Sequence, residues 1–148
     1  MTRSCLLFAC CAAALLSCND AGEGDKNADE EDQSPVKCYS YANSRDTISL
    51  TLIPVGESVT GTLEYSLDGK DRNKGTIQGV IRDELLVADY TFMSEGLRSV
   101  RQVAFLKKDS FYIEGYGEIE VTGNQSRFRN TDSLWYNDSI RLLETDCN

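Results

Sequence analysis

Apolar and polar residues alternate along most of the chain after residue 36. The alternation is clearest in residues 46–55 and 58–67, where apolar side chains fall mainly on every second position. A period of two is typical of β-strands with one buried face. The same pattern, less regular in places, predicts further strands in 38–42, 75–82, 85–94, 99–107, 110–121, 126–130 and 139–145.

Short polar segments separate these runs and favour tight turns, as at Gly56-Glu57 and Glu95-Gly96. No helical stretch is predicted after residue 36, and Trp135 and Tyr136 fall in a looser segment. The sequence therefore predicts an all-β domain, an antiparallel up-and-down meander. Such a meander hides its edges by closing into a small barrel of about eight or nine strands, lipocalin-like, or a flattened sandwich.

The first residues of the chain have the form of an export signal. Residues 5–16 are apolar, a run that fits a signal peptide and is too short to span a bilayer. Leu15-Leu16-Ser17-Cys18 ends this run and resembles the bacterial lipobox. The resemblance implies a signal peptide over residues 1–17 and lipidation of Cys18. An ordinary signal peptide or a short apolar tail remains the alternative.

Residues 18–35 have the composition of a disordered tether. Seven acids face one base, and no large apolar side chain is present. Such a segment buries too little surface to offset the entropy of ordering. An acidic run after a lipidated Cys also resembles the surface-export signal of Bacteroidota lipoproteins, which implies an outward-facing domain. A solubilising spacer is the alternative, and residues 36–148 form the single predicted domain.

The net charge of the chain limits the kinds of partner that it can bind. The 24 acidic and 15 basic residues give a net charge of −9, which makes nucleic acid an unsuitable partner because phosphate binding needs clustered Lys and Arg. The sequence holds no His, the commonest general base and metal ligand. No catalytic constellation, metal site or cofactor is therefore predicted, and we expect a protein that is not an enzyme.

The cysteines predict one disulfide. Of six Cys, three leave with the signal peptide and Cys18 takes lipid, so Cys38 and Cys147 remain. An even pair in an oxidising compartment favours a bridge, with two free thiols as the alternative. Since Cys38 opens the first predicted strand and Cys147 follows the last, this bridge would favour a closed barrel.

Four side chains are candidates for ligand binding. Tyr65, Tyr90 and Phe92 lie on predicted inner faces and would line an internal cavity. Arg101 is the fourth, but strand 99–107 is apolar on both faces. If Arg101 points inward, it needs a partner, which Asp89 or Glu95 could supply, or it captures an anionic group of a ligand.

Strand 110–121 carries a row of acids and two glycines. Glu114, Glu118 and Glu120 share a face with Tyr112 and Tyr116, which we interpret as a solvated outer face. Cation binding or acid–base chemistry is the alternative. The pair Gly115 and Gly117, with Gly61 and Gly79, would thin the inner face, either for barrel curvature or to make room for a ligand.

Part of the domain resembles a known group of proteins. Residues 74–77, 88–92, 94–96, 99 and 103–106 are similar to an uncharacterised group of small Bacteroidota lipoproteins. The resemblance implies an outer-membrane lipoprotein, and it does not imply any particular activity. We expect a membrane-anchored, non-catalytic module that binds a small or apolar ligand. The alternative is a protein-interaction or inhibitor module that meets an envelope protein through loops such as 94–96.

Overall fold

The computed structural model describes residues 35–147, most of which lie in β-strands. The predicted signal peptide, the lipidation site Cys18 and nearly all of the acidic tether lie outside this range. Within it, no helix is long and apolar enough to cross a membrane. The elements are β1 (Lys37–Ala42), β2 (Thr47–Val55), β3 (Ser58–Ser66), β4 (Asn73–Arg82), β5 (Leu85–Ser94), β6 (Leu97–Lys108), β7 (Phe111–Tyr116), β8 (Ile119–Thr122), β9 (Gln125–Phe128), the 3₁₀ turn η1 (Thr131–Ser133) and β10 (Trp135–Thr145).

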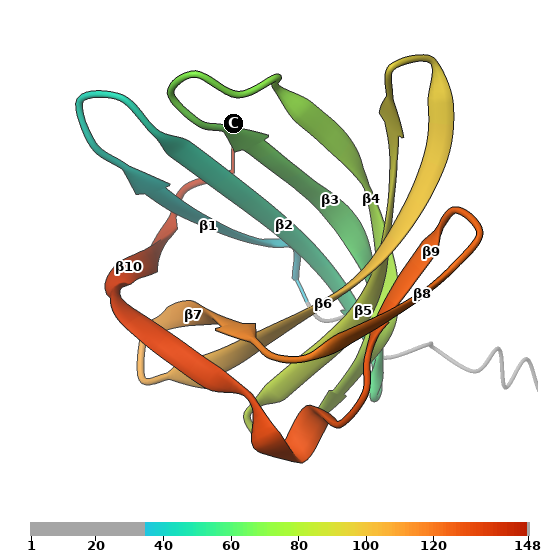
Figure 1. Ribbon diagram of the computed structural model, residues 1–148. Coiled ribbons are helices and arrows are strands. Elements are labelled where there is room, and N and C mark those ends of the chain that lie inside the picture. The colour runs from blue at the N-terminus through green and yellow to red at the C-terminus, as the bar shows by residue number, and fades with distance from the viewer. Residues whose placement is uncertain (1–34, 148) are drawn as a thin grey trace, which may run out of the picture.

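Eight of these strands close into a barrel (Figure 1). Strands β1 to β7 pair in sequence order, each antiparallel to the next, and β10 lies between β7 and β1. Pairing of β5 with β6 completes the ring. The predicted up-and-down meander is confirmed, and closure takes the barrel form rather than the flattened sandwich.

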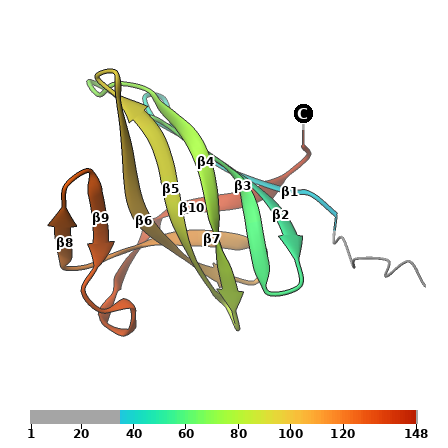
Figure 2. The same ribbon diagram turned by 90° about the vertical axis from the view of Figure 1, so that its right-hand side faces the viewer.

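The remaining two strands form a hairpin outside the ring. The chain leaves the barrel after Tyr116, so the single strand predicted over 110–121 is in fact β7 and β8. Figure 2 shows the β8–β9 hairpin beside the barrel wall. Its strand β9 runs parallel to β6 and pairs there through Val100 and Arg101. Trp135 and Tyr136, predicted to lie in a looser segment, are the first residues of β10.

The predicted inner faces make up the core. Ile48, Leu50 and Leu52 of β2 are at most 3% exposed, and Tyr39 of β1 and Val59 and Leu63 of β3 are at most 1% exposed. The ambiguity of strand 99–107 has a structural cause, because both of its faces are covered. Val103 and Phe105 point into the barrel core, whereas the outer face around Ala104 is also buried.

The strand glycines serve two different purposes. Gly61 and Gly79 lie on the inner face, where an added Cβ would come within 2.1 Å of a carbonyl oxygen of the adjacent strand. They therefore permit close backbone approach in a curved sheet. Gly115 and Gly117 lie on the outer face instead, so the prediction that they thin the interior is wrong. Leu134, from the segment before β10, packs over both.

The two ends of the barrel differ. At the disulfide end, β1 begins and β10 ends, and Cys38 and Cys147 form the predicted bridge with Cα atoms 5.3 Å apart. At the open end lie the β1–β2, β3–β4 and β5–β6 connections, which project to the same side in Figure 1. The last of these is the two-residue turn Glu95-Gly96, in which both residues have positive φ. The described chain thus enters the barrel at the end opposite to the open one.

Candidate functional site

A pocket of about 260 Å³ lies at the open end, inside the barrel. All four side chains predicted to bind a ligand line it: Tyr65 from β3, Tyr90 and Phe92 from β5, and Arg101 from β6. The structure therefore brings together residues from three separate strands. Residues of β7 and of the β3–β4 connection complete the wall.

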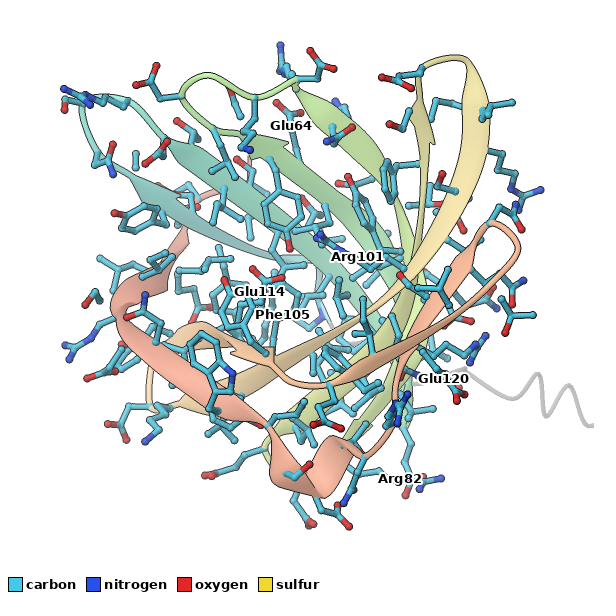
Figure 3. The ribbon with its side chains drawn as sticks, in the orientation of Figure 1. Glu64, Arg82, Arg101, Phe105, Glu114 and Glu120 are labelled. Atoms are coloured by element: carbon cyan, nitrogen blue, oxygen red, sulfur yellow. A yellow bond between two sulfur atoms is a disulfide. The ribbon has the colours of Figure 1, made fainter. Side chains whose placement is uncertain are left out.

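A buried carboxylate forms part of that wall. Glu114 is only 7% exposed and is the single buried charged residue in the range that the structure describes. Its oxygens accept hydrogen bonds from the hydroxyls of Tyr65, at 2.7 Å, and Tyr116, at 3.1 Å. A buried carboxylate is costly unless it is hydrogen-bonded in this way. Figure 3 shows Glu114 in the barrel interior, near Phe105.

This position corrects the prediction of a solvated acidic face. Glu118 and Glu120 are exposed as expected, but they lie beyond the end of β7 and do not share a strand with Glu114. Tyr112 of the same face is buried and makes an edge-to-face contact with Tyr39 at 4.9 Å. The prediction of a solvated face was wrong because it treated residues 110–121 as one continuous strand. In such a strand the three acids would form a single exposed row.

The protonation of Glu114 is balanced by opposing effects. Burial raises the pKa of this carboxyl above its usual value, and it is the largest influence. The hydrogen bond from Tyr65, the charge of Arg101 and the hydrogen bond from Tyr116 oppose it in that order. The net result is a raised pKa, so Glu114 holds its proton more readily than an exposed glutamate does.

The side chain of Arg101 faces the barrel interior, which is one of the two orientations that the sequence left open. Its partner is not one of the two predicted acids. Its Nη2 atom lies 3.9 Å from Glu114 Oε1, whereas Asp89 pairs with Arg127 at 2.7 Å. Asp89 lies between the inward residues Ala88 and Tyr90 and so points outward, away from Arg101. The proposed partners Asp89 and Glu95 are therefore wrong.

The guanidinium of Arg101 lies over aromatic rings. Its carbon is 5.2 Å from the ring centre of Tyr65 and 5.8 Å from that of Tyr90, both within the range of cation–π attraction. The Arg101 side chain is 44% exposed and makes no hydrogen bond to any residue in 35–147. Its N–H donors therefore remain available at the pocket.

The aromatic side of the pocket is a stacked pair. Tyr90 and Phe92 lie with ring centres 4.7 Å apart and planes within 16°. The hydroxyl of Tyr90 is buried and has no hydrogen-bond partner among the described residues. Burial raises the pKa of Tyr90 to about 12, so this hydroxyl remains a donor at neutral pH.

A smaller pocket adjoins the first. It measures about 140 Å³, lies against the β8–β9 hairpin, and shares Arg101, Glu114 and Tyr116 with the main pocket. Trp135 stacks on Tyr116, with ring centres 4.8 Å apart. Sequence reasoning assigned Glu114 and Tyr116 to an outer face and so missed their place in the pocket, and it did not predict that Trp135 stacks on Tyr116. The available signal was the alternation Tyr112-x-Glu114-x-Tyr116, which places the carboxylate between two large aromatic side chains on one face of the strand.

Two larger depressions lie elsewhere on the barrel. One, of about 640 Å³, is lined by residues such as Arg82, Asp83 and Asp132, and the other, of about 570 Å³, lies near Cys38. Neither contains the buried carboxylate. No group of three or more Asp, Glu, Cys or His side chains within residues 35–147 is arranged to hold a metal ion. The open-end pocket is therefore the candidate functional site.

The chain was also compared with known proteins. No protein-family model, no curated protein and no solved structure gave a significant match.

Proposed function

We propose that this protein is a lipid-anchored lipoprotein of the bacterial envelope, and that its barrel binds a small ligand without chemical conversion. The observation that carries the proposal is the open-end pocket, where aromatic walls meet a buried carboxylate and an arginine with uncommitted donors. Ligand sites are typically apolar cavities with a few well-placed polar groups, commonly in the mouths of β-barrels.

The polar groups of the pocket support binding over a purely structural role. A core that needed only stability would be better served by apolar side chains, because burial of a charge is costly. Here the cost is incurred at Glu114, while the half-exposed guanidinium of Arg101 beside it makes no hydrogen bond to any residue in 35–147. Groups left without partners beside a pocket are suited to a ligand that supplies them.

The surroundings of Glu114 favour a binding role over catalysis. Each of its oxygens already accepts a hydrogen bond from a tyrosine. A general base must be free to reach the proton that it abstracts. Glu114 is instead oriented by its neighbours, and it has no second buried carboxylate beside it in the described residues.

The direction of the chain supports a pocket that opens away from the membrane. Residue 35 precedes β1 at the disulfide end, and the pocket opens at the opposite end. A lipid on Cys18 would be joined to the barrel by a tether of 17 residues, with a reach of roughly 20–25 Å. In an outer-membrane lipoprotein, the pocket mouth would then face the aqueous side, whether periplasmic or outer.

Native mass spectrometry of the full chain, recovered from its own envelope in mild detergent, tests the proposal. Wild type should carry a reproducible added mass. A Leu67→Trp variant, which fills the pocket wall, should lose this mass. A Leu143→Trp variant should keep it, because Leu143 lies on the exterior and is 53% exposed. An unliganded wild-type mass would contradict the proposal.

A protein-interaction module is the second candidate function. Met93 and Leu97 flank the Glu95-Gly96 turn at the open end and are 59% and 71% exposed. Apolar side chains that are exposed together on a surface can mark a site of protein contact. For this candidate, Leu97→Ser should abolish binding of an envelope protein, and Leu67→Trp should leave it unchanged. The opposite result would favour the small-ligand proposal.

A further inference from the structure

We infer that the pocket takes a small aromatic carboxylate, a single ring that carries an anionic group. This inference rests on the proposed function and names the class of ligand. It follows from two properties of the pocket, namely the kind of polar group left unused and the shape of the apolar wall.

The unused polar groups are hydrogen-bond donors. Glu114 is only 7% exposed, and each of its oxygens already accepts a hydrogen bond from a tyrosine hydroxyl, so little of its acceptor surface faces a ligand. The distance from Arg101 to Glu114, 3.9 Å, is longer than a hydrogen bond and uses none of the five N–H donors of the guanidinium. Arg101 therefore offers donors that an acceptor-rich ligand can satisfy.

The charges at the rim do not reverse this preference. Lys70 and Asp71 of the β3–β4 connection also line the pocket, and their opposite charges offset each other. Lys70 makes no ion pair with any residue in 35–147. The planar fork of Arg101 matches a carboxylate bidentately, and bonds of this type are among the stronger ones in proteins.

The apolar wall is flat and suits one ring. Tyr90 and Phe92 are stacked in nearly parallel planes, and Tyr65 meets Tyr90 edge-on at 5.9 Å. Such faces favour offset stacking with a further aromatic group. A dry cavity of about 150 Å³ is enough to hold benzene. The pocket, at about 260 Å³, has room for one ring with a short acidic side chain.

Three matched probes test the inference on the full chain. They are 3-phenylpropanoate, 3-phenylpropanamide and 3-phenylpropylamine, which share a ring and spacer and differ in charge. Isothermal titration at neutral pH should give the carboxylate an affinity about tenfold or more above that of the amide, since a hydrogen bond between two charged groups is about twice as strong as one between neutral groups. The amine should bind most weakly.

A pair of arginine variants identifies the group responsible. Arg101→Gln should remove the preference for the carboxylate, and Arg98→Gln should retain it, because Arg98 is exposed on β6 and does not line the pocket. The comparison of the three probes needs only the wild type, so it stands even if Arg101→Gln fails to fold.

Two results would overturn the inference. If the amide or the amine binds as tightly as the carboxylate, the anionic class is wrong, but the pocket still binds small molecules and the proposed function stands. If none of the three probes binds at millimolar concentration, the aromatic class is wrong. The native mass measurement then judges the proposed function separately, because it makes no assumption about ligand chemistry.

Discussion

The hydroxyl of Tyr65 donates a 2.7 Å hydrogen bond to Glu114 across the inside of the barrel. The two residues are 49 positions apart, on β3 and β7, which are four strands apart in either direction around the ring of eight. This bond therefore joins opposite walls. On its disulfide side lies the apolar core, with the fully buried Phe105 beside Glu114, and on its open side lies the pocket.

The raised pKa of Glu114 predicts a specific pH dependence of stability. Burial is its main cause, and it gives the folded state a higher pKa than the unfolded value of about 4.5. The folded protein then binds the proton more tightly, so this contribution is fully present below the unfolded pKa and is lost as pH rises through the folded pKa. Relative to Glu114→Gln, wild type should gain unfolding free energy as pH falls from about 7 to about 5.

Chemical denaturation of both proteins across that range measures the effect. Glu118→Gln is the matched control, since it also removes one negative charge, from an exposed position next to β8. A difference between wild type and Glu114→Gln that is constant with pH, or that moves against wild type on acidification, would contradict the prediction.

Loss of the Tyr65 hydroxyl should destabilise the fold. Tyr65→Phe keeps the ring but leaves an oxygen of the buried Glu114 without its shorter hydrogen bond. Removal of one partner from a buried polar group costs about 1–3 kcal/mol. Tyr116→Phe should cost less, because Tyr116 is only half-buried and its bond is longer, at 3.1 Å. If urea denaturation gave equal losses of unfolding free energy for the two variants, the cross-barrel hydrogen bond would have no special role.

The disulfide should contribute strongly to stability. Cys38 and Cys147 are 109 residues apart, and the chain-entropy model gives up to about 4–5 kcal/mol for a loop of this length. The Cys38→Ser, Cys147→Ser double variant should therefore melt well below wild type. Reductant should lower the melting temperature of wild type and leave that of the double variant unchanged. A response of the double variant to reductant would contradict this assignment.

The inner glycines should resist substitution more than the outer ones. At Gly79 an added Cβ would lie 2.1 Å from the Val87 carbonyl oxygen, so Gly79→Ala requires the backbone to move. At Gly117 the nearest atom is Leu134 Cδ2, at 2.7 Å, the end of a flexible side chain. We expect Gly79→Ala to lower the free energy of unfolding by about 1–3 kcal/mol, as is typical of overpacking. The loss in Gly117→Ala should be several times smaller. Similar costs at both positions would refute the close-approach argument.

The barrel could be predicted from the sequence because its cause is local. Each strand buries one face, so the period of two marks the inward residues, and turns such as Glu95-Gly96 mark the ends. The disulfide could be predicted because Cys38 and Cys147 are the pair that remains once the predicted signal peptide and lipidation site are set aside. The aromatic part of the pocket could be predicted for the same reason, since Tyr65, Tyr90 and Phe92 continue the inward positions of β3 and β5 toward the open end.

The polar part of the site could not be predicted because its cause is distant in sequence. Glu114 is stabilised inside the barrel by Tyr65 from the opposite wall and by Arg101 from β6, in addition to Tyr116 of its own strand. No local pattern encodes that pairing. The inner face of β7 was difficult to identify for a related reason. Leu134 covers Gly115 and Gly117 from outside the barrel, so the outer face of this part of the chain is also buried. The sequence alone therefore does not show which face of β7 points inward.

Amide chemical-shift mapping is the most direct test of the central claim, that the open-end pocket is the binding site. The full isotope-labelled chain would be titrated with a small-molecule extract of its own envelope. We predict that the shifted signals cluster at the pocket, around Tyr65, Tyr90, Arg101 and Glu114, and that they vanish in Leu67→Trp. Absence of shifts there, or shifts confined to the outer surface, would contradict the claim.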